Sequence, residues 1–184
     1  GELLALVQRA ERAGFGSAMC SDHFHPWSRA QGQSGHAWAW LGSAMATTAL
    51  PYASVNSPVG RYHPAVVAQA IATLNAMHDD RYTLIAGSGE ALNEAMTCMR
   101  WPAKERRNRR LRSAVDAMRA LWRGEEVTML EPGMGFRIEA ARLHTLPGKE
   151  PRVFVAALSP QTAQWAAGWA DGLATISMER KKLQ

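Results

Sequence analysis

The sequence is poor in cysteine and contains no long apolar run. Cys20 and Cys98 are the only cysteines in 184 residues, and their spacing suits neither a metal site nor a disulfide framework, which is typical of proteins from the reducing cytoplasm. No stretch reaches the roughly 20 uninterrupted apolar residues of a membrane span, and the first residues lack the order of a secretion signal. We therefore expect a cytoplasmic protein that binds neither a metal ion nor a membrane.

Acidic residues are also in the minority, with 16 Asp and Glu against 21 Lys and Arg and a net charge of +5. Much of the excess lies in residues 104–112, at the start of a helix whose apolar residues Leu111, Val115, Met118 and Trp122 share one face. No aromatic residue that would stack on a base is interleaved with these charges. We therefore expect a solvated helix face and no binding of nucleic acid.

Apolar runs alternate with helical segments along the whole chain. The runs are almost continuously apolar, as in parallel sheets that are covered on both faces. Strands are predicted at five places, residues 17–20, 50–56, 82–86, 153–157 and 172–176. The chain therefore belongs to the α/β class.

Two architectures are compatible with this alternation. A flavodoxin-like sheet suits the length, because a complete (β/α)8 barrel of the TIM type needs around 250 residues. The barrel suits the loops, because chemically active side chains follow one strand after another, at Asp22 and His23, at Ser57 and at Glu90. The sequence starts with a helix and reaches only five strands, so a barrel would be incomplete and would lack its first strand and its C-terminal units; both architectures stay open at this point.

The length is that of a single domain, which we place at residues 1–184. Turn residues at 131–135 separate two short apolar segments, 127–130 and 136–138, in the pattern of a β-hairpin. We therefore predict one α/β domain with a small hairpin excursion at about residues 127–146, which is a partial α/β-barrel domain if the barrel interpretation holds.

The loop after the first predicted strand, Ser21–Trp27, combines an acid, two imidazoles and an indole. Ligands of α/β proteins bind where strands end. His23 titrates near neutral pH and suits a general base that Asp22 orients, and Trp27 offers a flat face to a ring. The alternative for each residue alone is structural, with a histidine that caps backbone groups and a tryptophan that packs.

Gly87-Ser88-Gly89 follows the third predicted strand and precedes Glu90. Glycines at a strand exit let the backbone approach a ligand and aim amide groups at an anion. The alternative is a tight turn into the next helix.

Five segments carry a resemblance to a known family, namely Ser21–Trp27, Ser54–Pro58, Arg61–Ala65, Gly87–Glu94 and Ala170–Gly172. In this order they resemble the bacterial luciferase-like superfamily, in the branch of the F420-dependent glucose-6-phosphate dehydrogenases and their flavin-using relatives. The resemblance implies a TIM-type barrel that binds F420 or FMN at its C-terminal face and forms a homodimer.

The resemblance also implies roles for individual residues. Asp22 and His23 would lie beside the cofactor ring, with His23 as the base that takes a hydroxyl proton. Trp27 would help to hold the reacting centre, and Glu90 would face the pyrimidine end of the cofactor as a proton donor.

Four further residues are implied as cofactor ligands. Ser54 and Val55 would form a bulge with a non-proline cis peptide behind the ring, although such a bond costs roughly 3–4 kcal/mol. Ser57 and Asn93 would hydrogen-bond to the cofactor.

Two departures from the dehydrogenase pattern concern the substrate. Leu158 and Ser159 stand where those enzymes have a pair of glycines near the cofactor phosphate. Glu179 stands where they have a lysine that grips the sugar phosphate, and its charge would repel that dianion. We therefore expect that glucose 6-phosphate is not the substrate.

Three functions remain open at this point. The first is an oxidoreductase that transfers a hydride between a flavin or F420 and a small organic substrate. The second is an FMN-dependent monooxygenase of the luciferase type. The third is a barrel that binds a flavin and has no catalytic activity.

Overall fold

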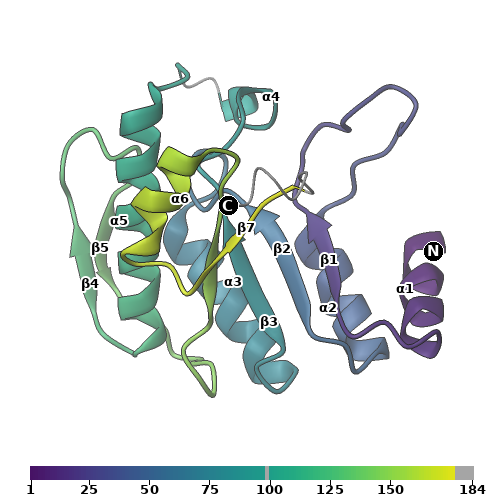
Figure 1. Cartoon of the computed structure of the whole chain (residues 1–184). Helices are drawn as coiled ribbons and strands as arrows, with labels where there is room; N and C mark the ends of the chain where they lie inside the picture. The colour runs from purple at the N-terminus through teal and green to yellow at the C-terminus, as the bar shows by residue number, and fades with distance from the viewer. Residues whose placement is uncertain (98–99, 177–184) are drawn as a thin grey trace.

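The computed structural model describes residues 1–97 and 100–176. Helices and strands alternate, as the sequence predicts for the α/β class (Figure 1). The helices are α1 (Glu2–Arg12), α2 (Ala37–Thr47), α3 (Pro64–Met77), α4 (Ala91–Glu94), α5 (Lys104–Trp122) and α6 (Pro160–Ala167), with a 3₁₀ turn at Ala95–Thr97. The strands are β1 (Ala18–Ser21), β2 (Tyr52–Asn56), β3 (Tyr82–Ala86), β4 (Val127–Met129), β5 (Ile138–Ala141), β6 (Val153–Ala156) and β7 (Gly172–Ala174).

The order of the strands decides between the two predicted architectures. Five strands form one sheet in the order β1-β2-β3-β6-β7, and every neighbouring pair is parallel. A flavodoxin-like sheet reverses its winding direction after the first strands, whereas a TIM-type barrel adds each strand beside the one before it. The sheet therefore has the topology of a barrel and contains five of its eight strands. The strands β4 and β5 pair antiparallel in a separate sheet.

Local signals start the helices that follow the strands. Pro64 occupies the first turn of α3, and the His63 ring accepts a hydrogen bond from the Ala65 amide at 3.3 Å. The Ser159 hydroxyl accepts one from the Thr162 amide at the start of α6, also at 3.3 Å. These caps end each loop at a defined residue, so they help to position the loops at the C-terminal ends of the strands.

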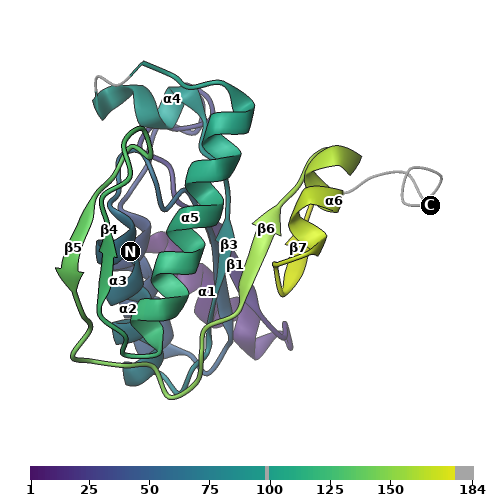
Figure 2. The same ribbon diagram turned by 90° about the vertical axis from the view of Figure 1, so that its left-hand side faces the viewer.

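The core lies between the sheet and helices α2, α3 and α5, which lie on one side of β1 and β3 in Figure 2. Tyr52 and Tyr82 are paired in register, and both side chains point into this core. The Tyr82 hydroxyl lies 2.5 Å from Ser54 Oγ, and the Tyr52 hydroxyl lies 2.7 Å from Thr48 Oγ1. The buried hydroxyl groups are thus paired with one another, as burial of polar atoms requires.

The arginines of α5 differ in part from the predicted solvated face. Arg106 and Arg110 both donate to the Gly133 carbonyl at 3.2 Å, and Arg119 forms an ion pair with Asp171 at 2.9 Å. A guanidinium group carries five donors, so it can bind another segment while it remains exposed. The basic face of α5 therefore holds the hairpin loop and the start of β7. Within the described residues, no helix has the length and apolar character needed to cross a membrane.

Candidate functional site

The C-terminal ends of β1, β2, β3 and β6 border a cavity of about 310 Å³. Its size lies at the lower end of the roughly 300–1,000 Å³ of small-molecule sites. Most of the residues predicted from the sequence to form the site contribute to its lining, namely Asp22, His23, Val55, Ser57, Glu90 and Asn93. Trp27 and Ser54 are predicted site residues that lie outside this lining.

Asp22 follows β1 directly and is held by three groups. Arg61 Nη2 lies 3.1 Å from its Oδ1, and the two side chains are only 8% and 2% exposed. The side-chain NH₂ group of Asn56 donates to Oδ2, and the Tyr62 hydroxyl donates to Oδ1 at 3.4 Å. Burial and the Asp22 carboxylate raise the pKa of Tyr62 to about 12, so its hydroxyl stays protonated as a donor. Asp22 therefore anchors the floor of the cavity.

Arg61 connects this anchor to Glu94, a residue to which the sequence analysis assigned no role. The Arg61 amide donates to Glu94 Oε2 at 2.7 Å, and Arg61 Nε lies 3.9 Å from Oε1. Burial raises the pKa of Glu94, and the amide and the charge of Arg61 act in the opposite direction. Arg61 and Glu94 both lie in segments that carry the family resemblance. Their positions are 33 residues apart, so no local sequence pattern could reveal that they are paired.

Asn93 is the central hydrogen-bonding residue on the other side of the cavity. Its Oδ1 accepts from the amides of Phe24 and His25 at 2.9 and 3.2 Å. Its Nδ2 lies 3.1 Å from His23 Nδ1 and 3.4 Å from Glu90 Oε2. The partner of the His23 ring is therefore Asn93, where the sequence favoured Asp22.

Burial lowers the pKa of His23, and the Glu90 carboxylate acts in the opposite direction. Trp27 lies against the same ring, with the ring centres 4.4 Å apart at an angle of 41°. The Trp27 side chain is 62% exposed. Its flat face thus supports His23 from outside the cavity.

The structure differs from the prediction at Ser54 and Val55. Both residues lie inside β2 and pair in register with β1 on one side and β3 on the other. The described residues contain no cis peptide bond. The pairing on both sides is continuous, so β2 forms no bulge at these residues. Ser54 points into the helix-side core and only Val55 reaches the cavity.

Gly89 has a structural reason to be glycine. Its φ is +81°, and an added Cβ would lie 3.0 Å from Ser57 Oγ. The Ser57 hydroxyl itself donates to the Val59 carbonyl at 2.8 Å. The segment between β3 and α4 forms a loop without a hydrogen-bonded turn, so the tight turn expected as one of two alternatives is not seen, and Ser88 and Glu90 of this loop line the cavity.

With this geometry, the chain can be compared with known proteins. The sequence profile of the luciferase-like monooxygenase family matches residues 1–183. The chain belongs to this family.

The relatives include several F420-dependent proteins. The F420-dependent glucose-6-phosphate dehydrogenase of Beutenbergia cavernae is 40% identical over 184 residues, which are 99% of this chain and 54% of that protein. An F420-dependent secondary alcohol dehydrogenase, solved with an F420-acetone adduct, matches with a TM-score of 0.92 and 36% identity over 99% of this chain and 56% of its own. The tetrahydromethanopterin reductase of Methanopyrus kandleri, at 18% identity and a TM-score of 0.77 over 95% of this chain and 51% of its own, shares the fold. The chain spans about half the length of the relatives that it matches.

One of the two departures from the dehydrogenase pattern, Leu158 and Ser159, lies at the β6 end of the cavity. Leu158, Ser159 and Thr162 line it there, and the Ser159 hydroxyl is engaged in capping α6. Lys104 reaches this part of the lining and donates to Ser88 Oγ at 3.3 Å. Glu179 lies outside the described residues, and among those described no group of three or more His, Cys, Asp or Glu is placed to hold a metal ion.

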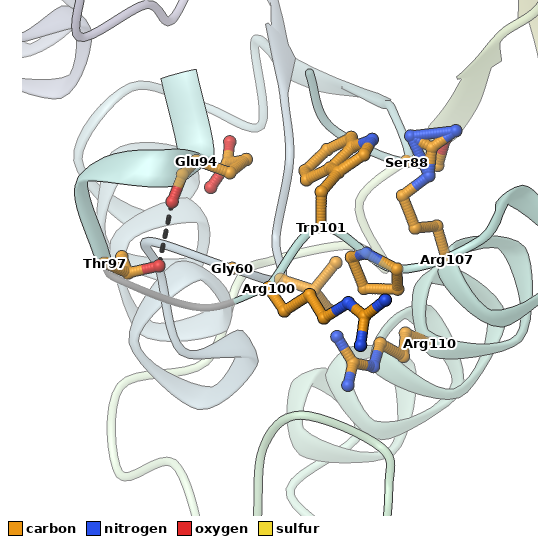
Figure 3. Close-up of a pocket in the computed structure, with 10 residues that line it drawn as sticks. Gly60, Ser88, Glu94, Thr97, Arg100, Trp101, Arg107 and Arg110 are labelled. Carbon is orange, nitrogen blue, oxygen red and sulfur yellow. Dashed lines mark hydrogen bonds between the residues drawn. The ribbon is translucent and has the colours of Figure 1, made fainter. Parts of the chain in front are cut away.

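A second, much smaller cavity of about 30 Å³ adjoins the first and shares Ser88 and Glu94 with it. Figure 3 shows Trp101 and three arginines around it, Arg100, Arg107 and Arg110. The Arg107 guanidinium lies 4.5 Å from the centre of the Trp101 ring. This volume is about that of one water molecule, so the residues in Figure 3 form a wall behind Glu94 rather than a ligand site.

Proposed function

We propose that this chain is part of an F420-dependent oxidoreductase that transfers a hydride between the cofactor and an alcohol or carbonyl carbon. The observation that carries the proposal is the cavity at the C-terminal strand ends, where His23, Asn93 and Glu90 converge. The similarity to the F420-dependent secondary alcohol dehydrogenase, over nearly the whole of this chain, supports this cofactor and this reaction class.

The residues of the cavity suit a flat, polar cofactor. Val55 would form an apolar wall, and Ser57, Glu90 and Asn93 would supply polar groups along its edge. Bound F420 supplies the hydride chemistry. The chain would position the substrate oxygen, a role that we assign to His23.

The charges of the lining favour a neutral substrate. In the described lining, the carboxyl groups of Asp22 and Glu94 are paired with Arg61, which leaves the Glu90 carboxylate and the cationic Lys104. A phosphate dianion would thus meet one cationic side chain and one carboxylate there, whereas a small alcohol or ketone needs no compensating charge. Relatives of this chain are named F420-dependent glucose-6-phosphate dehydrogenase. The expectation that glucose 6-phosphate is not the substrate of this chain therefore stays a prediction.

The test is a titration of the purified protein with F420 and, separately, with FMN. Binding is monitored by the change in intrinsic Trp fluorescence. Tight binding of F420 and weak binding of FMN are expected. Preference for FMN would replace the proposal by the luciferase-type monooxygenase, which consumption of oxygen with reduced FMN would then identify.

The same protein is next assayed for reduction of F420 by secondary alcohols and by glucose 6-phosphate. His23→Ala should retain F420 and lower turnover by about 10²-fold or more. If the protein binds F420 but neither substrate class reduces it, the non-catalytic barrel becomes the better description.

The proposal includes two finer expectations from the sequence, a homodimer and a cytoplasmic location. Light scattering after size-exclusion chromatography measures the first, and fractionation of the source cells measures the second.

A further inference from the structure

We propose that Asn93 selects the tautomer of His23, so that the neutral ring carries its proton on Nε2 and presents an N–H donor to the cavity. Asn93 is then a positioning residue that acts through His23. The role of this donor toward a substrate rests on the proposed function, whereas the tautomer itself does not.

The orientation of the Asn93 side chain follows from its backbone partners. Oδ1 lies 2.9 Å from the Phe24 amide nitrogen and 3.2 Å from that of His25, and both of these groups can only donate. The atom that faces them must therefore be the carbonyl oxygen. The NH₂ group then points in the other direction, toward His23 Nδ1 at 3.1 Å and Glu90 Oε2 at 3.4 Å.

The two hydrogens of this NH₂ group match two acceptors. The Glu90 carboxylate takes one hydrogen and His23 Nδ1 takes the other, which requires a lone pair on Nδ1. A neutral imidazole has one N–H group, and its position is set by the hydrogen bond of the other nitrogen. The proton is thus on Nε2, for which residues 1–97 and 100–176 offer no hydrogen-bond partner.

Protonation of Nδ1 would direct two N–H groups at each other. This repulsion adds to burial, which already lowers the pKa of His23. The other charged groups around the ring are Arg61, which lowers the pKa, and Glu90 and Asp22, which raise it. His23 is therefore neutral over most of the physiological pH range.

The consequence changes the role predicted for His23 from the family resemblance. A base needs a lone pair on the nitrogen that faces the substrate, and here Asn93 occupies the lone pair on Nδ1. An N–H donor at Nε2 instead stabilises negative charge that develops on a substrate oxygen, whether a carbonyl is reduced or an alcohol oxidised. It retains its own proton, so when an alcohol is oxidised the hydride would pass to the cofactor and the hydroxyl proton to another group of the lining, the carboxylate of Glu90.

The test is an ¹H–¹⁵N long-range correlation spectrum of the histidine side chains in the protein without cofactor, at alkaline pH. The His23 signals are assigned by their loss in His23→Gln. We expect the Nε2–H pattern in the wild type. A dominant Nδ1–H pattern would overturn the proposal.

Asn93→Asp is the informative variant, because its carboxylate can still accept from Phe24 and His25 but faces His23 with an acceptor. The protonated nitrogen should switch to Nδ1, and the pKa of His23 should rise. Gln31→Glu is the matched control. Gln31 accepts from the Trp27 amide at 2.9 Å, so a glutamate keeps that bond and adds the same charge to the loop that carries His23.

An unchanged tautomer in folded Asn93→Asp, or a switch in Gln31→Glu, would contradict the proposal. If Asn93→Asp does not fold, the wild-type spectrum still decides. Because no cofactor is present in these spectra, failure of F420 binding counts against the proposed function and leaves the tautomer result intact. In the active enzyme, Asn93→Asp should also move the midpoint of the pH–rate profile upward, which a purely structural residue would not do.

Discussion

Asp22 and His23 are neighbours in the sequence, but the structure places them in two different environments. The carboxylate of Asp22 is buried and paired with Arg61. The ring of His23 is half-buried at the cavity edge and meets Asn93, which also bonds to Glu90. The region of Asp22 and Arg61 therefore supports the loop, and the region of His23, Asn93 and Glu90 presents a titratable group to the cavity.

The difference between the two environments follows from the alternation of side chains along a strand. The Asp22 amide still donates to the Val55 carbonyl at 2.9 Å, so the pairing of β1 extends by one residue. Successive side chains of a strand point to opposite faces. Asp22 therefore points in the same direction as its neighbour Asn56, and His23 points away from it.

The largest effect is expected from Arg61→Met, which breaks the supporting region. The substitution leaves the buried carboxyl groups of Asp22 and Glu94 without their cation, and loss of one partner of a buried ion pair costs about 3–5 kcal/mol. Urea denaturation should show this loss of unfolding free energy. Arg112→Met is the control, because its exposed pair with Asp116 contributes only about 0.3–0.5 kcal/mol and its contact with the Trp169 ring, 4.9 Å away, about 0.5–1 kcal/mol. Equal effects of the two substitutions would contradict the distinction.

The next effect concerns Gly89, which lies between the two regions. Gly89→Ala should destabilise the protein by about 1–2 kcal/mol, because of the positive φ, with a further cost from the contact with Ser57. Gly42→Ala in α2 is the control. It meets no atom within 4 Å and should stabilise the helix by about 0.5–1 kcal/mol. Thermal unfolding of both variants measures the difference. A stabilised Gly89→Ala would show that the positive φ of Gly89 causes no strain in a residue with a side chain.

A smaller effect is expected in the pH dependence of the unfolding free energy, through Glu94. The pKa of Glu94 is raised in the folded state, so between the unfolded and folded pKa values the folded protein binds more protons. Its contribution to stability is thus present below the ordinary glutamate pKa of 4.5 and is lost as pH rises through the folded pKa. Glu94→Gln should flatten this part of the curve of unfolding free energy against pH. An unchanged curve would show that Glu94 is not desolvated.

The smallest effect has the opposite sign and comes from His23. Its pKa is lowered in the folded state, so the unfolded protein binds more protons in this range. The contribution to stability is present above the ordinary histidine pKa of 6.5 and is lost as pH falls through the folded pKa. His23→Gln should remove this slope while it leaves that of Glu94 in place. The same denaturation series measures it, and a slope that persists in His23→Gln would assign the titration to another group.

Much of the fold could be predicted from local patterns. The apolar runs locate β2 and β3 within two residues, and Pro64 and Ser159 mark the starts of α3 and α6. These signals are local because hydrogen bonding and capping involve residues a few positions apart. The sequential strand order also agrees with the expected barrel.

The partners within the site could not be predicted in this way. Sequence patterns brought Asp22, His23, Glu90 and Asn93 to one site, but they paired His23 with Asp22 and assigned Arg61 no role. Ser54 and Val55 were both placed at the cofactor, although strand alternation sends Ser54 into the core.

The sequence alone thus determined which residues form strands and helices and which loops gather at one end of the sheet. Only the tertiary structure decided which face each side chain occupies and which distant group it meets, as for Asn93 and His23, 70 positions apart. The physical reason is that a hydrogen bond depends on position within about 3.5 Å and on direction. Such precision arises when the strands are in register and the loops are packed.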